Sequence, residues 1–153
     1  MGWINTELLK SSDVLVLWNY PGYNLSDIGS SSLPKIRESH MNLIKSIRKW
    51  VNPNHLTTYG YSLGGFPSIQ NSQLVDKVVV YKSFWSQTAT ARGLSNPFLS
   101  YLYHINISNS YCLSHLFNTK KDINIIFSHK DSTMRLDSSL LYGYHYYITK
   151  LLR

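Results

Sequence analysis

The chain has 153 residues, of which 43% are hydrophobic, so its length and composition suit one folded domain and disfavour a disordered chain. Its single cysteine excludes a domain held together by internal disulfides, and no apolar run is long enough to predict a transmembrane helix. The formal net charge is +7, but no nucleic-acid-recognition motif accompanies it. We expect a solvated basic surface, with peripheral contact to anionic lipid or an acidic partner as the alternative.

The first part of the chain predicts one strand and a long loop. The run DVLVLW, residues 13–18, is continuously apolar, which is typical of a strand buried on both faces. Residues 19–32 contain Pro21, Gly22 and Gly29 and predict a loop. The opening sequence MGWINTELLK lacks the charged and apolar regions of a signal peptide, so we expect a cytoplasmic protein.

Residues 34–51 predict an amphipathic helix, because apolar side chains recur at three- and four-residue spacing. Pro53 prevents the helix from continuing. One set of side chains should face the sheet and a basic set should be exposed. The apolar set is Ile36, Leu43, Ile44, Ile47 and Val51, and the basic set is Lys35, Arg37, Lys45, Arg48 and Lys49.

Three further runs of apolar and β-branched residues predict strands over residues 56–61, 76–81 and 123–128. A short helix is expected over residues 63–71, and helical patterns fill the C-terminal stretch. Strands that alternate with helices imply βαβ units. The sequence therefore predicts a single α/β domain over residues 1–153, with a mainly parallel sheet and helices on both faces.

The sequence GYSLGG places Ser62 between glycines, directly after the second predicted strand. A G-x-S-x-G nucleophile elbow needs small residues two positions before and after the serine, because it presents Oγ on a sharp strand-to-helix turn. Gly60 and Gly64 hold these positions, and Gly65 would let the next helix pack closely. The backbone N–H of Leu63 would then point at a substrate oxyanion. The alternative is a glycine-rich turn without chemistry.

Four segments between residues 13 and 134 resemble, in order, motifs of the α/β-hydrolase superfamily. They are VLVLWNYPGYNLS, YGYSLGGF, VVVYKSFWS and IIFSHKDSTM. They are most similar to the branch that includes serine peptidase-like and phospholipid-lipase-like hydrolases. The second segment resembles the elbow, and the fourth resembles the strand and G-x-x-D turn that carry the catalytic acid. Ser128 stands where that glycine is usual.

The resemblance implies a Ser-His-Asp triad in the chain order serine, acid, histidine. The later aspartates are Asp122, Asp131 and Asp137, and Asp131 follows the carboxyl end of a strand, where α/β sites gather. It is the expected acid, with a helix N-cap as its alternative role. His145 is the only histidine after Asp131 and is the expected base. Its aromatic-rich surroundings also suit a purely structural histidine.

The leading interpretation is a serine hydrolase that cleaves an ester, thioester, amide or lipid acyl bond. Its substrate would be a small-molecule or lipid acyl compound. No cofactor fingerprint and no metal-ligand spacing is visible, so neither a cofactor nor a metal is expected. The alternative is a catalytically impaired hydrolase remnant, or a non-catalytic binding module that retains the elbow as a scaffold.

The family's first three strands have no counterpart before residue 13, so the domain is expected to be incomplete at its N-terminus. The loop after the third strand usually supplies the second oxyanion donor, and it is missing with them. Either residues 13–18 pair directly with residues 56–61, or the protein starts upstream of Met1.

Overall fold

A computed structural model describes residue 10 and residues 14–23, 26, 29–85, 121–130 and 135–151. The chain divides into two compact units, residues 1–36 and residues 37–153. The second unit contains the sheet and Ser62.

In the first unit, a strand was predicted over residues 13–18, and this prediction is wrong for residues 14–18, which the structure describes. Residues 14–18 have no regular secondary structure, and the side chains of Val14 and Leu17 are 62% and 68% exposed. The described sheet consists of three other strands, so residues 14–18 are not one of its strands. An apolar run forms a strand only where a neighbouring strand completes its hydrogen-bond ladder.

The predicted helix is confirmed as α2, Leu33–Trp50. Ile44 is buried, and the side chains exposed as predicted are those of Lys35, Arg37, Lys45 and Lys49. Two expectations on this segment are wrong. Val51 is 54% exposed because it follows the end of the helix, and Asn52 then takes a left-handed φ of 47°. Arg48 is half-buried because it forms an ion pair within the second unit.

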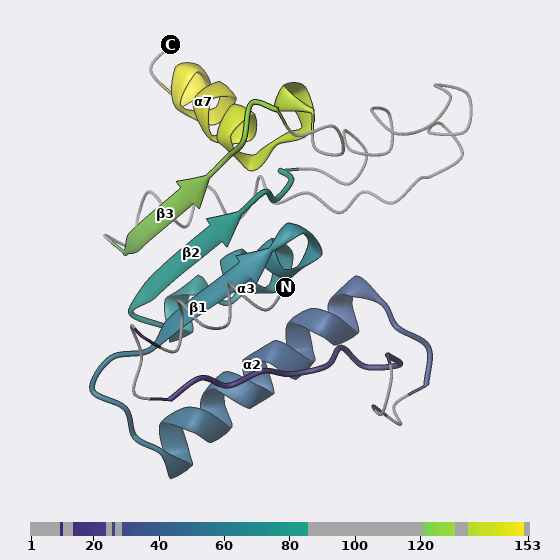
Figure 1. Cartoon of the computed structure of the whole chain (residues 1–153), viewed down its shortest axis with the longest axis vertical. Coiled ribbons are helices and arrows are strands. Elements are labelled where there is room, and N and C mark those ends of the chain that lie inside the picture. Colours follow the sequence, from purple (N-terminus) through teal and green to yellow (C-terminus); the bar gives the residue numbers. More distant parts are fainter. Residues whose placement is uncertain are drawn as a thin grey trace. The chain divides into compact units, whose positions relative to one another are not determined.

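The second unit is built on a three-stranded parallel sheet in the order β1-β2-β3 (Figure 1), which confirms the α/β class. The three later predicted strands are therefore confirmed, with small shifts of their ends. The strands are β1, Thr57–Tyr61; β2, Lys77–Tyr81; and β3, Asp122–Ile126. The other elements are the 3₁₀ turns η1, Ser62–Gly64, η2, Ser72–Leu74, and η3, Leu136–Ser138, with helices α3, Gly65–Gln70, and α7, Leu140–Leu151.

The core lies against one face of this sheet. Val78 and Val80 of β2 are fully buried, and Ile44 of α2, Ile69 of α3 and Leu140 of α7 belong to the same hydrophobic cluster. On the other face, burial is weaker, since Tyr61 is 43% and Ile126 46% exposed. Helices were predicted on both faces of the sheet, and among the described residues the buried cluster lies on one face only.

Asp76 connects the end of α2 to the start of the sheet. Its Oδ2 lies 2.7 Å from Arg48 Nη2 and accepts a 2.8 Å hydrogen bond from the backbone N–H of Leu56. The Leu56 N–H, followed by the Arg48 guanidinium, lowers the pKa of the Asp76 carboxyl below its ordinary value of 3.8. The folded protein therefore favours the charged carboxylate.

Replacing Asp76 with asparagine is expected to lower the free energy of unfolding by about 1 kcal/mol at neutral pH, since solvent screens this partly exposed pair. A lowered folded-state pKa stabilises the protein above the unfolded pKa, and this gain is lost as the pH falls through the folded pKa. Urea unfolding should therefore show that the difference in free energy of unfolding between the unmodified protein and Asp76→Asn shrinks as the pH falls below the ordinary carboxyl pKa of 3.8. The matched control is Asp122→Asn, whose carboxylate is 60% exposed beside Lys77. A difference that persists unchanged at low pH would contradict the assignment.

Candidate active site

Ser62 lies at the point where the chain turns from β1 into a helix. Tyr61, the last residue of β1, is extended, with φ −99° and ψ 131°, and Gly64 is already helical, with φ −63° and ψ −20°. Between them, Ser62 has a left-handed φ of 51°. A non-glycine residue in this conformation is uncommon and strained. The predicted tight turn at a strand's carboxyl end is confirmed.

Two glycines near Ser62, Gly60 and Gly65, lie too close to neighbouring atoms to carry a side chain. A Cβ atom on Gly60 would lie 2.4 Å from the carbonyl oxygen of Gly64, so the strand and the following turn touch through their backbones. A Cβ atom on Gly65 would lie 2.1 Å from Oγ and 2.4 Å from Cβ of Ser83. These positions therefore exclude side chains for the steric reason that an elbow demands.

Leu63 is the second residue of η1. The first N–H groups of a helical turn lack intrahelical acceptors, and they point away from the turn toward its N-terminal side. This position suits the oxyanion role that was predicted for the Leu63 N–H.

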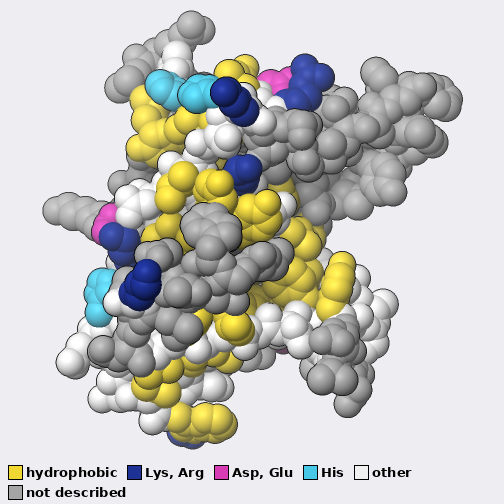
Figure 2. Space-filling view, viewed as in Figure 1, with side chains coloured by type: hydrophobic (Ala, Val, Ile, Leu, Met, Phe, Trp, Pro, Cys, Tyr) yellow, Lys and Arg dark blue, Asp and Glu magenta, His cyan; other side chains and the backbone are white. Residues whose placement is uncertain are grey.

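A second strained residue lies beside Ser62 at the carboxyl edge of the sheet. Tyr61 of β1 pairs with Tyr81 of β2, and the residues that follow them, Ser62 and Lys82, both have φ 51°. The Tyr61 and Tyr81 rings are 5.6 Å apart, and Lys82 Nζ lies 5.4 Å from the Tyr81 ring centroid. Apolar side chains lie on the visible surface over the carboxyl ends of β2 and β3 (Figure 2). The pairing of Tyr61 with Tyr81 at this edge was not predicted from the sequence, because it depends on the register between β1 and β2.

The acid predicted for the triad, Asp131, lies outside the described residues. The two other candidates are exposed and are paired with basic residues. Asp122 is the first residue of β3 and lies 3.0 Å from Lys77 Nζ, at the amino end of the strand. Asp137 lies in η3, 3.6 Å from Arg135 Nε. Neither takes the position expected of the acid.

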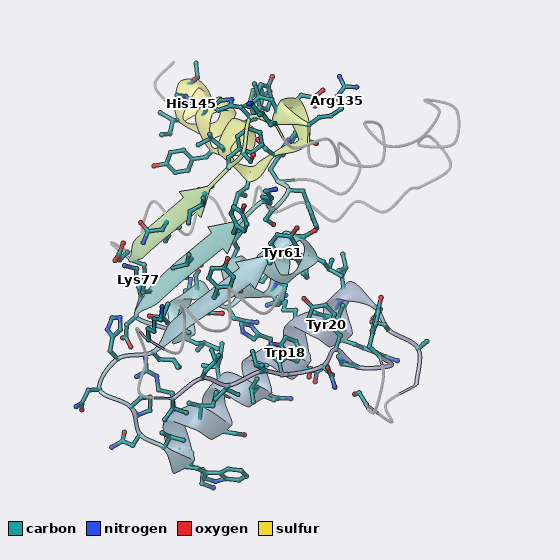
Figure 3. All side chains as sticks on the ribbon, in the orientation of Figure 1. Trp18, Tyr20, Tyr61, Lys77, Arg135 and His145 are labelled. Carbon is teal, nitrogen blue, oxygen red and sulfur yellow. The ribbon has the colours of Figure 1, made fainter. Side chains whose placement is uncertain are left out.

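His145 lies on α7, and its side chain is exposed. The helical period turns its neighbour Tyr144 toward the hydrophobic core instead. In Figure 3, His145 on α7 and Tyr61 at the end of β1 lie well apart. No hydrogen bond among the described residues joins the His145 ring to Ser62. The described part of the structure therefore does not bring the predicted base and the predicted nucleophile together.

The start of α7 is fixed to the segment that follows β2. The N–H of Leu140 donates a 2.8 Å hydrogen bond to the carbonyl of Ser83, and Trp85 Nε1 donates a 2.9 Å hydrogen bond to the carbonyl of Asp137. The Trp85 ring also stacks on Tyr146, with the ring centroids 6.5 Å apart. These contacts position α7, and with it His145, relative to β2.

Comparison with known proteins gives no match to this chain among protein-family models, curated proteins or solved structures. The resemblance to α/β-hydrolases therefore rests on the sequence segments given above. Among the described residues, no cluster of histidine, cysteine and carboxylate side chains could hold a metal ion. No described helix is long and apolar enough to span a membrane.

Proposed function

We propose that this protein is a serine hydrolase of the α/β-hydrolase type and that Ser62 is its nucleophile. The observation that carries this proposal is the left-handed φ of 51° at Ser62, on a strand-to-helix turn where side chains at Gly60 and Gly65 would collide with neighbouring atoms. Strain of this kind persists only where the surrounding structure enforces it, and it clusters at active sites.

In the proposed reaction, Ser62 Oγ attacks the carbonyl carbon of an ester, thioester, amide or lipid acyl group. The base takes the serine proton, and the Leu63 N–H donates to the oxyanion of the tetrahedral intermediate. The leaving group departs with the proton, and water then releases the acyl group from Ser62. The proposal keeps His145 as the base and Asp131 as the acid that orients it. Tyr61 and Tyr81 beside the turn suit an apolar acyl chain.

A second candidate is a catalytically impaired remnant or a non-catalytic binding module that retains the elbow. The exposed position of His145 on α7, apart from Tyr61 in Figure 3, favours this candidate. The serine hydrolase is preferred because the strained φ at Ser62 coincides with a strand-to-helix turn that is closed by glycines on both sides, which a nucleophile elbow requires.

Hydrolysis of short- and long-chain acyl esters by three proteins distinguishes the candidates. The intact protein should hydrolyse at least one ester, and Ser62→Ala should reduce the rate to the background. His145→Ala should lose nearly as much, because the members of a triad act as a unit. Ser31→Ala and His55→Ala, at exposed positions, are the matched controls and should retain activity.

Two results would change the assignment. Hydrolysis that depends on Ser62 but is unaffected by His145→Ala would remove His145 from the mechanism. No Ser62-dependent hydrolysis of any ester would contradict the enzyme and favour the binding module.

A further inference from the structure

Four polar side chains from separate elements of the second unit meet in the interior, behind the elbow. Each is more than nine-tenths buried. They are His40 of α2, 5% exposed; Thr58 of β1, 8%; Ser68 of α3, 2%; and Asn71, which follows α3, 4%. Buried polar groups are costly unless they are hydrogen-bonded, so their partners indicate what the cluster does.

The cluster forms a chain of hydrogen bonds that ends on the elbow. Ser68 Oγ donates to the carbonyl oxygen of Gly64 over 2.9 Å. Thr58 Oγ1 lies 3.1 Å from Ser68 Oγ, and His40 Nε2 lies 3.3 Å from Thr58 Oγ1. A continuous path therefore runs from α2, through β1 and α3, to the residue two positions after Ser62.

The number of hydroxyl protons fixes the direction of this chain. Each hydroxyl has one proton, and that of Ser68 is used on Gly64. The hydrogen bond between the two hydroxyls therefore needs the proton of Thr58. Thr58 must then accept from His40, so His40 carries a proton on Nε2. All the donors point toward the elbow carbonyl.

The other ring nitrogen of His40, Nδ1, lies close to Asn71 and Pro67. Asn71 Nδ2 lies 3.2 Å from Nδ1 and also donates to the carbonyl of Arg37, while the carbonyl of Pro67 lies 3.1 Å from Nδ1. In the neutral ring, Nδ1 accepts from Asn71. Burial lowers the pKa of His40, although the Pro67 carbonyl opposes this effect, so the neutral ring is favoured. The proton on Nε2 is assigned from the hydrogen-bond directions given above.

We propose that His40 is a positioning residue, which acts through Thr58 and Ser68 to hold the Gly64 carbonyl and thereby the strained turn that presents Ser62. Loss of the Thr58 hydroxyl interrupts the series of hydrogen bonds between His40 and Ser68. The Ser68 hydroxyl is then held by fewer partners and can rotate more freely. The turn then loses one of the constraints that keep Ser62 in its left-handed conformation. This inference deepens the proposed function. The tests that measure the reactivity of Ser62 rest on the proposed function, whereas the role of His40 in holding the turn does not.

The test compares Thr58→Val with Val75→Ala. Val75 is 1% exposed in the same core and is not part of the chain of hydrogen bonds, so its variant controls for a general loss of stability. Urea unfolding measures the stability of both, and the second-order rate constant for fluorophosphonate labelling measures the reactivity of Ser62. We expect Thr58→Val to lower this rate constant by about tenfold and Val75→Ala to leave it within about twofold.

Two variants of His40 test the direction of the chain. In His40→Gln, the side-chain amide keeps a donor toward Thr58, and this variant should retain most of the labelling rate. In His40→Leu, no donor remains, and labelling should slow as it does in Thr58→Val. Equal slowing in Thr58→Val and Val75→Ala would show a purely structural role and overturn the proposal, as would a labelling rate unchanged by Thr58→Val.

Amide hydrogen exchange separates this inference from the proposed function. The backbone amides of residues 62–66 and 68 should exchange faster in Thr58→Val than in Val75→Ala, whether or not Ser62 reacts. If the intact protein is not labelled at Ser62 but this difference appears, the proposed function fails and the positioning role stands. If the exchange of these amides is the same in both variants, the positioning role fails.

Discussion

Gly65→Ala is expected to destabilise the folded protein by about 3 kcal/mol or more, as overpacking of a well-packed interior does at its upper end. The new Cβ atom would lie 2.1 Å from Ser83 Oγ, 2.4 Å from Ser83 Cβ and 2.8 Å from Val80 Cγ1. Neither neighbour can move away easily, because Val80 is fully buried and the Ser83 carbonyl accepts the Leu140 N–H. The helix after the elbow would have to separate from β2.

Gly60→Ala should destabilise the protein to a similar extent, because its Cβ would meet the backbone of Gly64 at 2.4 Å and 2.6 Å. Urea unfolding measures both variants. The control is Gly29→Ala, where no atom lies within 4 Å but φ is +46°, so the expected cost is only the left-handed backbone strain of about 1–2 kcal/mol. If Gly65→Ala costs no more than Gly29→Ala, the close packing at the elbow is refuted.

The parts of the fold that depend on local pattern could be predicted from the sequence. The apolar runs at residues 76–81 and 123–128 became β2 and β3, and the helical period became α2. The turn at Ser62 could also be predicted, because Gly60 is needed for a steric reason within a few residues of chain, where its Cβ would meet the backbone of Gly64. Local sequence and local geometry agree in each case.

The parts that depend on distant partners could not be predicted in this way. Residues 14–18 have the composition of a strand but lack a place in the three-stranded sheet. Arg48 fitted the exposed basic set, but its partner Asp76 lies 28 positions further along the chain. His40 lies four positions from both Ile36 and Ile44, so the helical spacing alone places it on the inward face, whereas Thr58 and Ser68, its hydrogen-bond partners, come from other elements. A general base must also lie close to the serine hydroxyl, and this distance depends on the tertiary structure rather than on local sequence.

The second large expected effect is the covalent labelling of Ser62 by a fluorophosphonate. A fluorophosphonate carries an electrophilic phosphorus that reacts with an activated serine hydroxyl and forms a stable phosphonyl adduct. Activation needs a general base and a donor for the developing charge, and a solvated serine has neither. We therefore expect the intact protein to be labelled at Ser62 and Ser62→Ala to lose the label completely. Exposed serines such as Ser31 should stay unmodified.

The most direct test of the central claim is peptide mass spectrometry after this labelling, on the intact protein, on Ser62→Ala and on urea-unfolded protein. The account predicts one adduct, located on Ser62, in the folded intact protein and none in the other two samples. Absence of an adduct on the folded protein, or an adduct of equal yield in Ser62→Ala or after unfolding, would contradict the claim that the strained turn presents a reactive nucleophile.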